Sequence, residues 1–212
     1  YDGWWNINNS YGVAATLGGS DNALWMDGCL LDSPTSITGT NDVPYHLWLD
    51  FIQKSVVGPM YITAESKPAG IRITGSDNYG ALTFQGTRVE GRNDSASSFG
   101  SVVRMEGGRV TFRDCWLSYG FSDAASSGRT GEGGVVSVLG GHALFDRCWY
   151  GRAGGDGVAE TVPWIYASGA STEVRVRNAE TEFGGGSFTG LPRVEAVSSA
   201  TLDLDNSVTE VV

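Results

Sequence analysis

Phe112-Arg113-Asp114-Cys115-Trp116 returns 33 residues later as Phe145-Asp146-Arg147-Cys148-Trp149. Both copies place one large apolar residue, two charged residues, a cysteine and a tryptophan in the same order. Self-similarity at a period of roughly 20–50 residues is typical of proteins built from stacked repeats. The motif therefore predicts a repeat architecture, and its large apolar residue serves as an anchor for aligning further copies.

The anchor recurs in short apolar segments along the chain. The aligned segments are 81–84, 109–112, 142–145, 173–176 and 201–204, and their anchors lie 28, 33, 31 and 28 residues apart. An earlier copy is 23–26. Leu49 is assigned as a further anchor, although its separations of 23 and 35 residues from the neighbouring anchors fit the period less well.

Each repeat also contains two other short strands. A turn rich in Gly and Ser separates the anchor segment from the strand before it, and a polar pair separates it from the strand after it. The preceding strands are expected at 71–73, 102–105, 135–138, 164–167 and 194–197. The following strands are expected to begin at 29–31, 87–89, 115–117, 148–150, 179–181 and 207–209. Three short strands per roughly 30 residues predict stacked β-coils.

Equivalent positions of the repeats have matched chemistry. The third position after each anchor is small, as a tight inner corner requires, and is occupied by Cys29, Thr87, Cys115, Cys148, Ala179 and Ser207. The first corner position alternates in charge through Arg113, Asp146, Arg177 and Asp205, and the second position reads Asp114, Arg147, Asn178 and Asn206. Opposite charges on neighbouring strands each contribute about 0.2–1 kcal/mol. The columns therefore predict that successive repeats lie directly over one another.

This arrangement resembles the pectate-lyase-like family of right-handed parallel β-helices, which includes phage tail spikes and tail fibres. The resemblance rests on the architecture and on the two motif copies, and on no catalytic motif. We expect an all-β, single-stranded, right-handed parallel β-helix of roughly five to seven coils. Residues 1–22 are assigned as an N-terminal lead-in or cap, and residues 23–212 as the β-helix, with the best-phased coils in 71–212. A barrel or sandwich would instead predict hairpin turns every 8–12 residues or so.

Composition narrows the class of function. The chain has 212 residues, 31 of them Gly, about twice the usual share, which suits many tight turns. Its formal net charge is −10, so a nucleic-acid binder, which needs a basic face, is excluded, and no apolar run is long enough for membrane insertion. Three cysteines and two histidines fit neither a disulfide framework nor a zinc site, so no metal and no cofactor are expected.

Two tryptophans are the first candidates for a binding role. Trp116 and Trp149 hold matching positions on adjacent repeats, and each follows a cysteine expected to point inward. Both indoles should therefore point outward, where they could stack on sugar rings or be buried against a neighbouring subunit. Trp4, Trp5 and Trp25 gather near the start of the chain, where covering the open end of the first coil is the expected role.

Loop carboxylates are the second set of candidates. The Gly- and Ser-rich segments 91–100, 120–134, 151–163 and 184–192 share one phase of the repeat and should gather on one side of the stack. They carry Asp123, Glu132 and Asp156, which are assigned to the same glycan or subunit contact. Arg129 with Glu132, and Arg152 with Asp156, are the local pairs that an enzyme would use. Solvated loop acids are the alternative interpretation.

The resemblance implies a virion-borne or extracellular protein. The expected function is that of a structural and host-recognition protein, such as a tail spike or tail fibre segment. It is expected to form a homotrimer, to contact other virion proteins and to bind a cell-surface polysaccharide. No enzymatic activity is expected. The alternatives are a polysaccharide depolymerase or lyase on the same fold, and a bacterial surface adhesin. The sequence is expected to be a piece of a longer polypeptide.

Overall fold

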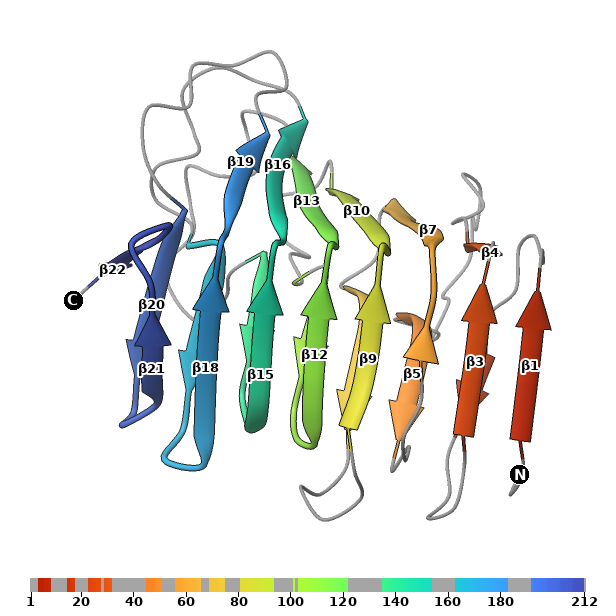
Figure 1. The fold of residues 1–212 in the computed structure, drawn as a ribbon, viewed down its shortest axis with the longest axis horizontal. Helices are drawn as coiled ribbons and strands as arrows, with labels where there is room; N and C mark the ends of the chain where they lie inside the picture. The colour runs from red at the N-terminus through yellow and green to blue at the C-terminus, as the bar shows by residue number, and fades with distance from the viewer. Residues whose placement is uncertain are drawn as a thin grey trace.

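The described part of the chain consists of strands joined by turns. The computed structural model describes residues 4–8, 15–17, 23–27, 29–31, 45–50, 56–65, 69–74, 81–93, 101, 103–121, 135–153, 163–182 and 192–211, and no helix occurs among them. These strands form three sheets, which we name A, B and C, and every pairing between neighbouring strands is parallel (Figure 1). The predicted all-β class with parallel sheets is therefore confirmed.

Along most of the described chain, successive strands belong to sheets A, B and C in a repeating order. Sheet A contains β1 (Trp4–Asn8), β3 (Ala23–Asp27), β6 (Val56–Val57), β9 (Ala81–Gln85), β12 (Arg109–Arg113), β15 (Gly141–Asp146), β18 (Thr172–Arg177) and β21 (Thr201–Leu204). Sheet B contains β4 (Cys29–Leu31), β7 (Met60–Glu65), β10 (Arg88–Asn93), β13 (Trp116–Phe121), β16 (Trp149–Ala153) and β19 (Glu180–Glu182). Sheet C contains β2 (Ala15–Leu17), β5 (Tyr45–Asp50), β8 (Ala69–Thr74), β11 (Val103–Met105), β14 (Val136–Val138), β17 (Ile165–Ser168), β20 (Arg193–Val197) and β22 (Thr209–Val211).

The anchor residues form a column inside the stack. Phe84, Phe112 and Phe145 are direct partners in the ladders β9–β12–β15. Their rings lie parallel, with centroids 5.0 Å apart in both pairs, and all three are almost fully buried. Trp164 packs against the last of them at a tilt, 5.8 Å from centroid to centroid. The stacking of equivalent aromatic rings thus continues the apolar core from one repeat to the next.

The polar corner between sheets A and B has a fixed backbone shape. Its second residue is in the left-handed region in four successive repeats, at Gly86 (φ 65°), Asp114 (52°), Arg147 (51°) and Asn178 (53°). Gly, Asn and Asp tolerate this conformation best, which explains their frequency in this column. The corner N–H groups still bond to the next repeat, with Asp114 N donating to Asp146 O at 3.0 Å and Arg147 N to Arg177 O at 3.0 Å.

The small inner residues after the corner also link repeats. Thr87 Oγ1 donates to the Gly58 carbonyl at 3.0 Å, Cys115 Sγ to Phe84 O at 3.4 Å and Cys148 Sγ to Phe112 O at 3.3 Å. Burial, together with the neighbouring Cys115 thiol, raises the pKa of the Cys148 thiol, which keeps it protonated as a donor. Both cysteines are free and buried. The column is therefore occupied by small side chains, and Thr87, Cys115 and Cys148 use theirs to donate to a backbone carbonyl of an earlier repeat.

Two strand assignments made from the sequence are wrong. Leu49 lies in β5, which pairs with β2 and β8 in sheet C, and the anchor position between Met26 and Phe84 belongs to Val57. Val57 is 31 residues after Met26 and 27 before Phe84, so its spacing fits the other repeats better than that of Leu49.

The second correction concerns the last repeat. Residues 207–209 were expected to begin a strand of sheet B, but β22 pairs with β20 in sheet C. The side chains of Asp205 and Ser207 accept hydrogen bonds from the backbone N–H groups of Asn178 and Ala179, at 2.7 and 2.8 Å. The Asn178 N–H thus bonds to a side chain, whereas the equivalent Arg147 N–H bonds to the carbonyl of the next corner, and the chain passes directly to sheet C.

Candidate functional site

The outer face of sheet B carries the two tryptophans singled out in the sequence. Cys115 and Leu117 are fully buried, and Trp116 between them is only half-buried, so its side chain lies on the opposite, outer face. Trp149 is the direct partner of Trp116 in the β13–β16 ladder. The same column continues to Arg88 on β10 and to Glu180 on β19. We call Arg88, Trp116, Trp149 and Glu180 the sheet B column.

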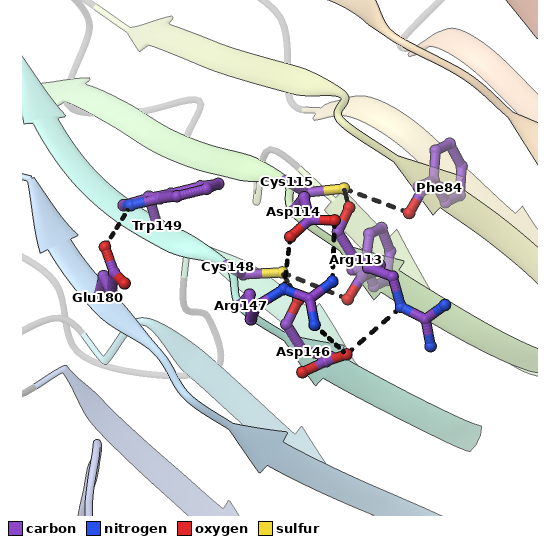
Figure 2. Close-up of polar contacts among 10 residues, drawn as sticks. Phe84, Arg113, Asp114, Cys115, Asp146, Arg147, Cys148, Trp149 and Glu180 are labelled. Carbon is purple, nitrogen blue, oxygen red and sulfur yellow. Dashed lines mark hydrogen bonds and ion pairs between the residues drawn. The ribbon is translucent and has the colours of Figure 1, made fainter.

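Each indole of the sheet B column meets a charged neighbour. The Arg88 guanidinium lies over the Trp116 ring, 4.0 Å from its centroid. Trp149 Nε1 donates to the Glu180 carboxylate at 2.6 Å (Figure 2). Among the described residues, the buried Trp116 Nε1 and Ser118 Oγ have no hydrogen-bond partner. The column therefore combines aromatic surface with a cation at one end and an anion at the other.

The loop acids assigned with these tryptophans cannot be placed beside them. Asp123, Glu132 and Asp156 lie outside the described residues, so neither catalytic pair can be placed. Arg129 also lies outside them, and Arg152 lies in β16 without its partner Asp156. In the described part of the chain, no group of three or more His, Cys, Asp or Glu side chains is placed to hold a metal ion. The described segments also include no helix with the length and apolarity needed to cross a bilayer.

Charges at the polar corner are paired across repeats. Arg113 contacts Asp146 at 3.3 Å, and Arg147 Nε donates to Asp114 at 2.7 Å (Figure 2). The hydrogen bond from Arg147 holds the pKa of Asp114 below its ordinary value. The two predicted columns of opposite charge are confirmed at these repeats.

The charge column changes partners in the last repeat. Arg177 was expected to face Asp205, but its guanidinium donates to Asp203 at 2.6 Å. The hydrogen bond from Arg177 lowers the pKa of Asp203. Asp205 instead accepts the backbone N–H of Ser207 at 2.9 Å as well as that of Asn178. The corner charges thus serve the stacking of repeats and are poor candidates for ligand binding.

No protein-family model, curated protein or solved structure matches this chain.

A trough on the outer face of sheet A was missed in the sequence. It has a volume of about 420 Å³, and it is open to solvent along the surface of β12, β15 and β18. The outward side chains that line it form two in-register rows, Arg109, His142 and Glu173 in one, and Thr111, Leu144 and Arg175 in the other. We call this group the sheet A trough.

The polar residues of the trough orient one another. His142 Nδ1 and Glu173 Oε2 are 2.8 Å apart, and the other oxygen of Glu173 contacts Arg175 at 2.6 Å. The hydrogen bonds from Arg175 and then His142 lower the pKa of Glu173, so this carboxylate stays ionised to a lower pH than an ordinary glutamate. In a sequence, the outward residues of an anchor strand cannot be told from ordinary solvated surface residues. The one signal that could have indicated the trough was that His142 is one of only two histidines in the chain.

Proposed function

We propose that the chain is a right-handed parallel β-helix that forms a stiff segment of a virion appendage, such as a tail spike or tail fibre. Supporting the helical arrangement, the strands from β3 to β21 belong to sheets A, B and C in a repeating order, and each pairs in parallel with its equivalents in neighbouring repeats. Crossovers between parallel strands of one sheet are right-handed in about 98% of cases, which favours that hand.

The in-register ladders are the observation that carries the structural part of this proposal. Sheets A and C each extend over eight strands, so hydrogen bonds run along the long axis from repeat to repeat (Figure 1). The phenylalanine stack and the ion pairs at the corners follow the same direction. An assembly held in this way resists bending and suits an extracellular rod, and a homotrimer would bury one flank of each rod.

The sheet B column supports the recognition part of the proposal. A sugar ring has an apolar C–H face and a rim of hydroxyl groups, and an outward indole with charged neighbours offers a surface complementary to both. Trp116 and Trp149 lie one strand spacing apart, about 4.8 Å. We therefore propose that this column binds a cell-surface polysaccharide, without catalysing its cleavage.

Replacing both indoles tests this role. In Trp116→Ala/Trp149→Ala, binding to host-surface polysaccharide in a glycan array should weaken by roughly ten-fold or more, because two ring contacts are lost. Trp116→Phe/Trp149→Phe keeps both aromatic faces and should stay within a few-fold of the unmodified chain. Circular dichroism of both variants verifies that the strands remain folded.

Two further readouts on the same proteins separate the alternatives. If sedimentation shows that the alanine variant loses its trimer while glycan binding is unchanged, the column is a subunit interface and the glycan role is wrong. If reducing or unsaturated ends accumulate when the unmodified chain is incubated with capsular polysaccharide, the protein is a depolymerase and the non-catalytic role is wrong.

A further inference from the structure

The sheet A trough has an apolar floor and a polar rim. Leu144 lies on the central strand, with Thr111 on one neighbouring strand and Arg175 on the other. Arg109, His142 and Glu173 form the parallel row two residues earlier along the same three strands. The floor can therefore contact a compact ring while the rim donates to its polar substituents.

The trough is locally cationic on an acidic protein. Its lining includes two guanidiniums, Arg109 and Arg175, and one carboxylate, Glu173, and these three groups together carry a single positive charge. Glu173 and Asp203 lie within 2.6 and 3.8 Å of the Arg175 guanidinium. The exposed Arg109 has no ion-pair partner among the described residues. The rest of the chain brings the formal net charge to −10, so the surplus cation is a local feature.

We propose that the trough is a second binding site, for a sugar or similar compact ring that carries one singly charged oxyanion, a carboxylate or a sulfate ester. The Arg109 guanidinium pairs with the oxyanion, since its planar fork matches both groups. Leu144 and Thr111 contact the ring. A single surplus positive charge matches a monoanion better than a phosphate dianion. This site lies on a different sheet from the sheet B column, and it does not depend on the proposed appendage role.

His142 provides a reporter inside the site. The chain has two histidines, so its imidazole proton signals are few, and comparison with His142→Asn assigns those of His142. The unmodified chain is titrated in parallel with sodium glucuronate, glucose 6-sulfate, glucose and sodium acetate, at constant ionic strength and pH 7.5 with EDTA present. We expect saturable shifts of the His142 signals with glucuronate, glucose 6-sulfate or both, and none with glucose. Acetate should bind at least several-fold more weakly, because it has no ring.

Arg109→Ala and Arg113→Ala form the matched pair of variants. Both arginines are exposed on β12 and lie on the same face, but only Arg109 lines the trough. Arg109→Ala should weaken binding roughly ten-fold through loss of a charged hydrogen bond, and Arg113→Ala should leave it within two-fold. Trp116→Ala/Trp149→Ala should leave the His142 shifts unchanged. Absence of saturable shifts with both anionic sugars, equal binding of glucose, equal binding of acetate, or unaltered binding by Arg109→Ala would each overturn the proposal.

Discussion

Gly141→Ala is expected to destabilise the protein by roughly 4 kcal/mol or more, a large share of the stability of an ordinary domain. Gly141 has a φ of 81°, a conformation that L-residues rarely adopt. A Cβ at this position would lie 2.3 Å from the Gly108 carbonyl oxygen and 2.8 Å from two further backbone atoms. That carbonyl accepts the His142 N–H at 2.9 Å, so it cannot retreat without loss of a bond between repeats.

Gly108→Ala is the control for the conformational part of this effect. Gly108 occupies the equivalent turn one repeat earlier, with a φ of 85°, but no atom lies within 4 Å of the Cβ that alanine would add. Gly108→Ala should lower the free energy of unfolding by only about 1–2 kcal/mol, which is the strain of a left-handed residue. Urea denaturation followed by circular dichroism measures both variants. Equal costs for the two substitutions would show that the turns of neighbouring repeats do not touch as described.

Phe112→Ala should destabilise the protein by about 4–5 kcal/mol. Phe112 is 1% exposed and is the central ring of the three-ring column, so its removal opens a cavity and ends two ring contacts at once. Backbone hydrogen bonds in the ladders on both sides fix the strand spacing, so the neighbouring rings cannot close the gap.

Phe112→Leu is the matched variant, because it keeps most of the buried volume. Phe112→Leu should lower the free energy of unfolding by about 1.5 kcal/mol or less. The same urea denaturation measures both variants, with the slope of the transition as a check that unfolding remains a single step. A cost for Phe112→Ala below about 2 kcal/mol would mean that this ring is not enclosed between Phe84 and Phe145.

The repeat, its three strands and its inner column could be predicted because stacking imposes chemistry at fixed positions. An anchor that must lie on another anchor is selected to be large and apolar, as Phe84, Phe112 and Phe145 show. A corner that requires a left-handed residue selects Gly, Asn or Asp, and opposite charges such as Asp114 and Arg147 become direct neighbours. Such constraints leave a signal in a single sequence.

Features that depend on a choice between two neighbouring strands, or between a side chain and a strand as hydrogen-bond partner, left no such signal in the sequence. In the segment that contains Leu49, apolar residues occur in two neighbouring strands, so pattern alone could not tell the sheet C strand β5 from the anchor strand β6. The path of the last repeat depends on side-chain caps by Asp205 and Ser207, which a strand pattern does not encode. The sheet A trough brings together outward residues of three repeats, and its contacts, such as His142 with Glu173, join residues 31 positions apart that no local pattern in the sequence relates.

The central claim is that equivalent residues of successive repeats lie side by side in register. Engineered disulfides test this claim most directly. Thr111 and Leu144 are direct partners in the β12–β15 ladder, so their Cα atoms lie about 4.8 Å apart, within reach of a disulfide. Thr111 and His142 are offset by two residues, which places their Cα atoms roughly 8 Å apart. Peptide mapping by mass spectrometry should find the bridge in Thr111→Cys/Leu144→Cys after mild oxidation, and find none in Thr111→Cys/His142→Cys. A bridge in the offset pair alone, or in neither pair, would contradict the parallel in-register stack.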